Sequence, residues 1–213
     1  MIEPEKKRLF TFFDCQNLFK SAQAAWGYSY PNFDPIKLSL LIPKLLPDCL
    51  LRKIYIYTGI HHPKKDYNWY YFWDRKLKVA SQDPRVTTVT RELRYTFTNG
   101  IPIPREKGID VKISLDLIRL ARENMYDTAV IFSQDNDFAE VAMELREVSK
   151  TNDRWIKIAS AFPIHNNGSK ERGIKGTDWI KITKENYDSC IDNNDYRPQE
   201  EISSVTQSEP VQV

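Results

Sequence analysis

Short apolar runs alternate with amphipathic stretches along most of the chain. Runs rich in β-branched and aromatic side chains predict buried strands at residues 9–13, 51–57, 85–93, 129–132, 155–159 and 178–182. Between them, apolar residues recur every three or four positions and predict helices near residues 18–26, 34–46, 69–80, 109–123, 138–145 and 184–191. Residues 94–105, with Asn99-Gly100, predict a hairpin, and residues 161–176 predict a polar loop or a short helix.

Strands that alternate with helices predict a mostly parallel sheet with right-handed crossovers and helices on both faces. The expected fold class is therefore α/β, a three-layer α/β/α arrangement of the Rossmann-like kind. No internal repeat or second core interrupts residues 1–191, so we expect a single domain there. Residues 192–213 are rich in Ser, Gln, Glu and Pro, and we expect them to form a disordered acidic tail.

Composition narrows the function classes only moderately. Hydrophobic residues make up 41% of the chain and charged residues 28%, as in an ordinary soluble globular protein. No apolar run is long enough to span a membrane, and the N-terminal residues lack the apolar segment of a signal peptide. Three widely spaced cysteines argue against a disulfide framework or a zinc site, so we expect a reducing, cytoplasmic location.

The net charge of +2 is too small to indicate a partner by itself. Residues 192–213 hold five acids and one Arg, a net of −4, which leaves +6 on the preceding residues. A mildly basic domain is compatible with nucleic acid binding and equally with an ordinary surface.

Polar residues replace apolar ones abruptly where two predicted strands end. Asp14 follows the first strand, and Ser133-Gln134-Asp135-Asn136-Asp137 follows the strand at 129–132. Asp110 lies near the start of the helix that precedes the strand at 129–132. The carboxyl ends of parallel strands share one edge of a sheet, where ligands bind. For residues 133–138 alone, a capped helix with one spare surface Asp remains an equally good interpretation.

Several carboxylates in one cleft repel each other, so a protein keeps them together with a cation between them. Ligand sets made only of oxygen select hard cations such as Mg²⁺ or Mn²⁺. Such ions orient a phosphodiester, generate a hydroxide and stabilise the leaving oxygen.

Three sequence blocks carry a family resemblance: residues 12–19, residues 107–112 with Asp116 behind them, and residues 133–138. In these blocks the chain resembles the NYN domain, a family of the PIN-like superfamily of metal-dependent ribonucleases, and most closely its LabA-like branch. The resemblance covers about residues 8–190, and the segment from Ser169-Lys170 to Asp178-Trp179-Ile180 resembles the last strand of the family and its lead-in.

The resemblance implies a catalytic, metal-binding centre for Mg²⁺ or Mn²⁺ formed by Asp14, Asp110, Asp135 and Asp137. It also implies that Asn17 holds the first acid or a metal-bound water and that Ser133 shapes the loop. Asp116 lies six residues after Asp110, about 600° around a helix, which leaves the two side chains about 120° apart. A supporting role behind the ligands and a structural surface position both stay open for Asp116.

Two positions depart from the family pattern. Cys15 and Gln134 stand where the family usually has Gly, so both loops are expected to be more crowded. Cys15 has no His nearby in the sequence to act as a base, and we expect a buried structural thiol there.

Basic and aromatic residues near these blocks are candidates for binding a nucleic acid. Phosphate-binding candidates are Lys107, Lys112, Arg91, Arg94 and Arg105, and base-stacking candidates are Tyr28 and Tyr30, with Phe33 more easily explained by packing. A solvated helix face is the alternative for the lysines. His61-His62 lacks the partners of a metal site, and the aromatic stripe at 69–73 fits a core or a contact within a homo-oligomer.

The leading functional hypothesis is an endoribonuclease that hydrolyses RNA phosphodiesters through a metal-activated water, and the superfamily resemblance implies a 5′-phosphate product. The alternative is a catalytically weak or inactive nucleic-acid-binding regulatory protein on the same fold, which the substituted glycines and the mild charge favour. The four retained acids speak against it. A phosphatase with an aspartyl nucleophile would need a second acid where Gln16 stands, and a dinucleotide enzyme would need a G-x-G-x-x-G motif that the chain lacks.

Overall fold

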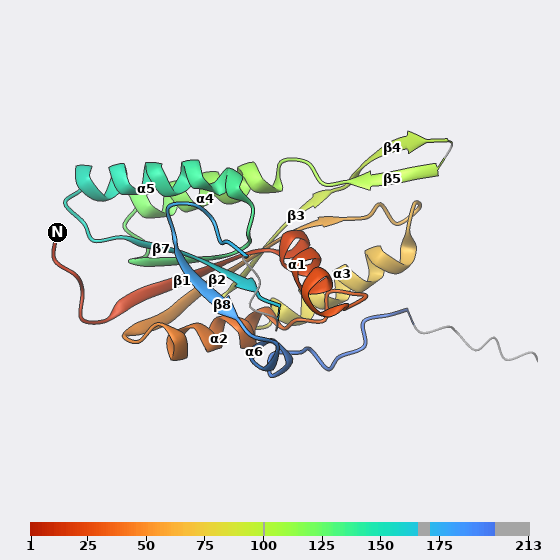
Figure 1. Ribbon diagram of the computed structural model, residues 1–213. Coiled ribbons are helices and arrows are strands. Elements are labelled where there is room, and N and C mark those ends of the chain that lie inside the picture. Colours follow the sequence, from red (N-terminus) through yellow and green to blue (C-terminus); the bar gives the residue numbers. More distant parts are fainter. Residues whose placement is uncertain (100, 166–170, 199–213) are drawn as a thin grey trace, which may run out of the picture.

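Figure 1 shows the computed structural model, which describes residues 1–99, 101–165 and 171–198. A central sheet of six strands has the order β3-β2-β1-β6-β7-β8, and every neighbouring pair is parallel. The strands are β1 (Lys7–Asp14), β2 (Cys49–Ile60), β3 (Val86–Glu92), β6 (Thr128–Phe132), β7 (Lys157–Pro163) and β8 (Asp178–Ile182). The helices are α1 (Cys15–Trp26), α2 (Pro35–Leu45), α3 (Tyr67–Ala80), α4 (Ile109–Arg122), α5 (Ala139–Thr151) and α6 (Lys184–Asp188).

The predicted three-layer α/β/α fold is confirmed, and the sheet is parallel throughout. β1 lies in its middle and is buried on both faces, which explains why residues 9–13 are apolar apart from Thr11, whose hydroxyl is hydrogen-bonded to Ser39 Oγ at 2.8 Å. Leu9 and Phe13 point into the core beneath α1, α2 and α3, whereas Phe10 and Phe12 point into the core beneath α4 and α5. Each such buried side chain contributes about 1.5–3 kcal/mol of transfer free energy.

A two-stranded antiparallel hairpin extends from the body between β3 and α4 (Figure 1). It consists of β4 (Arg94–Thr98) and β5 (Ile101–Arg105), with Arg94 directly opposite Arg105 at its base. The predicted hairpin is therefore confirmed, and Gly100 at its turn lies outside the described residues.

Several element boundaries differ from the predictions. β2 continues to Ile60, past the end that we predicted before Thr58-Gly59. β7 spans Lys157–Pro163 instead of 155–159, so Ala161 belongs to a buried strand and not to a polar loop. The small residues Ala159, Ser160 and Ala161 give no clear apolar pattern, although all three are fully buried. Residues 171–176 contain no helix, and Asn166-Asn167-Gly168 and Ser169-Lys170 lie outside the described residues.

The C-terminal strap, residues 192–198, packs against the domain. Tyr196 is 5% exposed, and Asp192 Oδ2 accepts a hydrogen bond from the buried Lys76 Nζ at 2.7 Å. The packed domain therefore continues past residue 191, where we predicted the start of the tail. Residues 199–213 lie outside the described residues.

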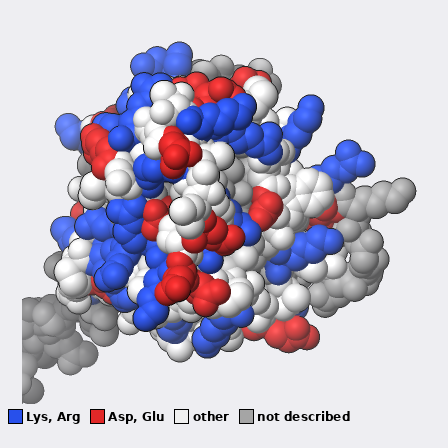
Figure 2. Space-filling view, turned by 90° about the vertical axis from the view of Figure 1, so that its left-hand side faces the viewer, with Lys and Arg blue, Asp and Glu red and all other residues white. Residues whose placement is uncertain are grey.

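The amino ends of the strands carry paired charges. Arg8 at the start of β1 donates to both carboxylate oxygens of Asp127, through Nε at 2.9 Å and Nη2 at 2.7 Å. Arg154 lies 3.5 Å from the same carboxylate, and Lys157 pairs with Asp178 at 2.7 Å. Figure 2 views this end of the molecule and shows Lys and Arg side chains interleaved with Asp and Glu.

The three cysteines are buried free thiols, and burial raises the pKa of the Cys15 thiol well above its usual range. None of the helices in the described ranges combines the length and the apolar character that crossing a lipid bilayer requires.

Candidate functional site

Asp14 ends β1 and caps the N-terminus of α1. Its Oδ1 accepts from the backbone N of Asn17 at 3.0 Å, and its Oδ2 accepts from Ser133 Oγ at 3.4 Å. Ser133 reaches Asp14 because β1 and β6 pair in register up to Phe13 and Phe132, the residues directly before them. Asp14 is therefore a fixed carboxylate at the carboxyl edge of the sheet, and it is 7% exposed.

The loop after β6 is folded around the same point. The Asn17 side chain accepts from the backbone N of Gln134 at 2.9 Å, and Ser133 Oγ accepts from the backbone N of Asp135 at 3.1 Å. Asp135 in turn accepts from the backbone N of Asp137 at 3.1 Å and so caps the short 3₁₀ turn η1 (Asn136–Phe138). Asn17 and Ser133 thus join the first and third sequence blocks.

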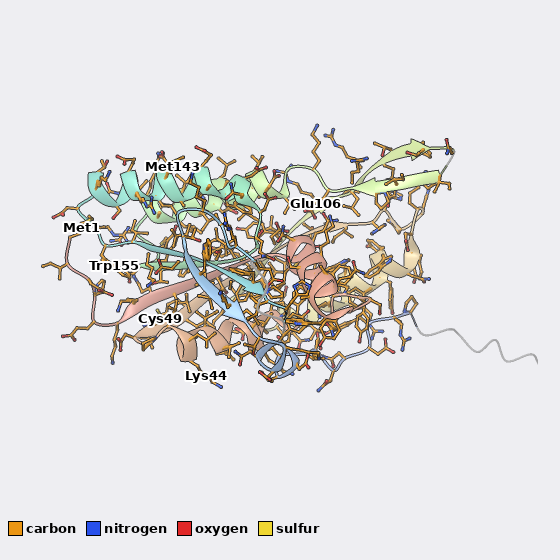
Figure 3. All side chains as sticks on the ribbon, in the orientation of Figure 1. Met1, Lys44, Cys49, Glu106, Met143 and Trp155 are labelled. Carbon is orange, nitrogen blue, oxygen red and sulfur yellow. The ribbon has the colours of Figure 1, made fainter. Side chains whose placement is uncertain are left out.

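The segment that leads into α4 carries Asp110 and also Glu106, which the sequence analysis did not identify. Asp110 lies in the exposed first turn of α4, after Gly108, whose φ of +79° favours glycine. Glu106 Oε2 accepts from the backbone N of Gly59 near the end of β2 at 2.6 Å. Figure 3 shows Glu106 at the opposite end of the sheet from Met1 and Trp155. A Cβ at Gly59 would lie 2.8 Å from Glu106 Oε2, so glycine allows this close approach.

Electrostatic coupling connects the acids of the three blocks. Burial raises the pKa of Asp14 to about 6, with a further contribution from the negative charge of Asp135. Burial likewise raises the pKa of Glu106 to about 7, and the charges of Asp14 and Asp110 add to the shift. We call Asp14, Glu106, Asp110 and Asp135 the acidic centre. No ion pair within the described residues neutralises any of its four members.

The donor chemistry of the acidic centre fits a hard divalent cation, because all of the donors are carboxylate oxygens and their negative charges repel each other. In the part of the chain that the structure describes, however, no three His, Cys, Asp or Glu side chains converge tightly enough to hold an ion as they stand. Asp110 and Asp137 are exposed and make no side-chain hydrogen bond with described residues, so both side chains are free to change rotamer.

Asp116 lies inside the fold and not on its surface. It is 3% exposed, and its carboxylate accepts from Tyr57 Oη at 3.0 Å and from Lys112 Nζ at 2.6 Å. Burial and the charge of Asp116 raise the pKa of the Tyr57 hydroxyl. Asp116 therefore contributes to the packing of α4 against β2, and Lys112 is its partner.

The expected substrate-binding residues lie in different surroundings. Lys107 and Arg105 are exposed, and Arg105 Nε donates to Thr96 Oγ1 at 3.2 Å across the hairpin. Tyr28 is half-buried and stacks on Tyr187 of α6 with ring centroids 5.3 Å apart. Tyr30 is 48% exposed. Of these two rings, that of Tyr30 is the more accessible to solvent.

The arrangement of the strands and the acids defines an α/β domain of the PIN-like kind, with carboxylates at the carboxyl edge of a parallel sheet. The family model of the NYN domain matches residues 8–153, so the chain belongs to the NYN family, which is part of the PIN-like nuclease superfamily. This confirms the family predicted from the three sequence blocks, and the assignment to the LabA-like branch stays a prediction.

The fold is also found in a solved structure. It is the crystal structure of VPA0982, a protein of unknown function from Vibrio parahaemolyticus, with a TM-score of 0.56 and 15% sequence identity. The match covers 88% of this chain and 99% of that one. No curated protein matches the sequence.

Proposed function

We propose that the protein is a metal-dependent endoribonuclease that hydrolyses RNA phosphodiesters at the acidic centre. The observation that carries the proposal is a group of mutually repelling carboxylates, without ion-pair partners among the described residues, in a domain of a nuclease superfamily. Buried carboxylates that repel each other destabilise the folded state, so their presence at a ligand-binding edge favours a functional role.

Asp14, Asp110, Asp135 and Asp137 would hold a Mg²⁺ or Mn²⁺ ion, which when bound orients a phosphate group and makes a water more acidic. Asp14 is fixed for this role by Asn17 and Ser133. The side chain of Asn17 keeps the third block next to the first through Gln134.

Glu106 fits the role of a proton acceptor. A general base is most effective when its pKa lies near the working pH, and the pKa of Glu106 is raised to about 7. Its Oε2 is occupied by the backbone N of Gly59, which leaves Oε1 for a proton.

Cations around the hairpin would bind the RNA backbone. Arg94 and Arg105 face each other across it, and like charges directly opposite one another are unfavourable unless an anion lies nearby. Arg91 lies about 3.5 Å from the position that a Cβ on Gly108 would take, at the start of α4, and Lys107 is exposed beside it. Lys112 suits this role less well, because its ammonium group is paired with Asp116.

The test is cleavage of labelled single-stranded and structured RNA with Mn²⁺, with Mg²⁺ and with EDTA. We expect metal-dependent cutting that leaves a 5′-phosphate and falls at least about 100-fold in Asp14→Asn and Asp135→Asn, the order of one essential catalytic group. Asp178→Asn is the matched control, since it makes the same chemical change at the amino edge, where Asp178 pairs with Lys157. Undiminished cutting by Asp14→Asn would contradict the proposal.

The alternative function is a nucleic-acid-binding regulator with little or no activity. It is favoured by the finding that, within the described residues, no three acids converge on one point. RNA binding by the wild type in EDTA, without cutting in either metal, would select this alternative.

A further inference from the structure

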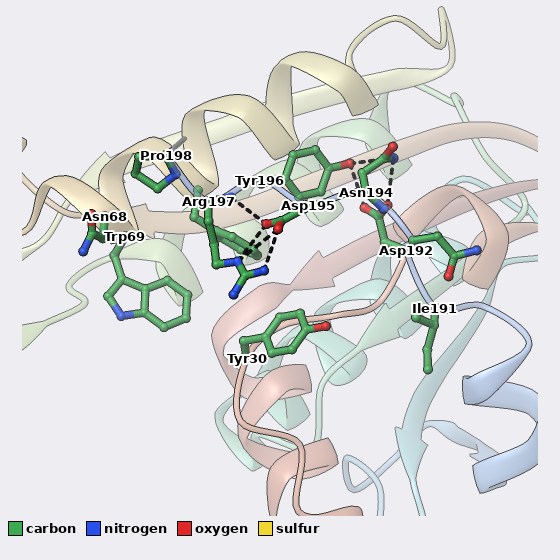
Figure 4. A pocket seen from close by; sticks show the side chains of 12 residues that line it. Tyr30, Asn68, Trp69, Ile191, Asp192, Asn194, Asp195, Tyr196, Arg197 and Pro198 are labelled. Carbon is green, nitrogen blue, oxygen red and sulfur yellow. Dashed lines mark hydrogen bonds and ion pairs between the residues drawn. The ribbon is translucent and has the colours of Figure 1, made fainter. Parts of the chain in front are cut away.

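The C-terminal strap closes a pocket of about 740 Å³ against the loop after α1 and the first turns of α3 (Figure 4). The pocket combines aromatic rings with side-chain amides, a lining typical of sites for small flat ligands. Its lining residues are Tyr30, Asn68, Trp69, Phe72 and residues 191–198. None of the acids of the acidic centre belongs to it.

The aromatic walls of the pocket are held in place by one buried ring. Phe72 is 8% exposed and contacts Trp69, Tyr196 and Tyr30 edge-on, with ring centroids 5.4, 5.8 and 6.5 Å away. The Tyr30 ring is itself 48% exposed. Rings that are fixed before a ligand arrives lose little entropy when they bind one.

The ionic groups of the lining are already neutralised in pairs. Asp192 binds Lys76 at 2.7 Å, and Asp195 binds Arg197 at 2.6 Å. The ammonium group of Lys76 also lies 5.1 Å from the centre of the Tyr196 ring, which adds a cation–π contact that holds the strap. A pocket with balanced charges favours an uncharged ring over a phosphate or a metal ion.

The amides supply hydrogen-bonding groups at the rim. Asn68 and Asn193 are exposed, and their side chains make no hydrogen bond with other described residues. Each amide offers both a donor and an acceptor, which is what the edge of a nucleobase requires.

The pocket and the acidic centre share the carboxyl edge of the sheet. Tyr30 follows α1, the helix that Asp14 caps, and Trp69 lies in the first turn of α3, which follows β2. The end of β2 carries Gly59, the partner of Glu106. The elements that carry the pocket are therefore the ones that follow the strands of the acidic centre along the chain.

From this geometry we propose that the pocket binds an unpaired nucleobase against the rings of Tyr30 and Trp69. The base comes from single-stranded RNA or from a free nucleotide, and the first source rests on the proposed function. The site would give the protein a preference for unpaired RNA, because a base inside a duplex is not available for stacking.

The test measures binding of a labelled single-stranded RNA to the full chain in EDTA, where cleavage plays no part. Trp69→Ala and Tyr30→Ala should each weaken binding about tenfold, the share of one stacked base. Trp69→Phe keeps a ring and should remain within about threefold of the wild type. Tyr67→Ala is the matched control, since Tyr67 is an exposed aromatic residue on the same helix but outside the pocket. Thermal unfolding of each variant checks that it is folded.

An abasic site in the RNA gives a readout that needs no variant. Moved along the strand, it should weaken wild-type binding at one position and leave Trp69→Ala unaffected there. Adenosine monophosphate tests the second source, and quenching of tryptophan fluorescence that disappears in Trp69→Ala would support a free nucleotide. If neither ligand depends on Trp69 or Tyr30, the inference is overturned, whether or not the protein cuts RNA. Binding that depends on Trp69 in a protein that does not cut would support the pocket and overturn the nuclease.

Discussion

The two edges of the central sheet treat buried acids in opposite ways. At the amino edge, burial raises the pKa of Asp127, but the hydrogen bonds and charge of Arg8 more than offset this, so its pKa lies below the usual range. At the carboxyl edge, burial and neighbouring acids raise the pKa of Asp14 and of Glu106, and the charge of Lys20 and the hydrogen bonds that the two carboxylates accept offset this only in part. Paired acids contribute to stability, whereas the acidic centre reduces it and is better explained by a ligand that it binds.

The largest effect is expected when the ion pairs of Asp127 at the amino edge are broken. Asp127→Ala leaves Arg8 and the half-buried Arg154 without their carboxylate partner and should lower the free energy of unfolding by about 3 kcal/mol. Urea denaturation measures the change. Asp178→Ala, an exposed acid at the same edge, is the control and should cost less than about 1 kcal/mol. Equal losses in the two variants would remove the distinction between the edges.

Removing the carboxylate that the sequence did not reveal should lower activity without lowering stability. Glu106→Gln keeps the size of the side chain and an acceptor for Gly59 but loses the proton acceptor, so kcat/KM should fall about 100-fold. Glu92→Gln, at the exposed end of β3, should leave kcat/KM unchanged. A fall of less than about threefold in Glu106→Gln would exclude Glu106 as the base.

The contribution of the acidic centre to stability should depend on pH. A carboxyl whose pKa is raised on folding stabilises the protein below its unfolded pKa, and this stabilisation is lost as the pH rises through the folded pKa. For Asp14 the window runs from about 4 to about 6, and the loss is about 3 kcal/mol. Urea denaturation of the metal-free protein should show a decline over this window, to which Glu106 also contributes, and Asp14→Asn should make the decline smaller. A wild type whose stability rises across the window would contradict the coupling.

The smallest effect concerns the cations that would bind RNA. Arg105→Ala should weaken RNA binding about threefold and reduce the salt dependence by about one phosphate contact. Arg122→Ala removes the same charge from the far end of α4, where Arg122 pairs with Glu144. Equal effects of the two variants would mean that the hairpin is not a binding surface.

Much of the fold could be predicted from local pattern. The mostly apolar residues 9–13 of β1 and the abrupt change to polar residues after β6 indicated a buried parallel sheet. The positions of Asp14 and Asp135 follow from where those strands end. Helical periodicity likewise identified α4 and α5. These features depend on residues that are close together in the sequence, so the sequence alone was sufficient to predict them.

The remaining features depend on contacts between distant parts of the chain. Glu106 joins the site only because the hairpin returns it to the end of β2, where it meets Gly59, 47 positions away. The strap packs because Asp192 reaches Lys76, 116 positions away. Composition alone placed residues 192–198 in a tail. Tyr28 and Tyr30 were given the same role because both lie near the first acid block, although one ring is stacked on α6 and the other is exposed.

The most direct test of the account is the thermal unfolding of the metal-free protein at pH 8, with and without Mn²⁺. Wild type should unfold several degrees higher with Mn²⁺, because an ion bound to the folded state stabilises it. Asp14→Asn should start higher than the wild type without metal and gain little from Mn²⁺. Equal stabilisation of both proteins by Mn²⁺, or none of either, would contradict the claim that the acidic centre is kept for a cation.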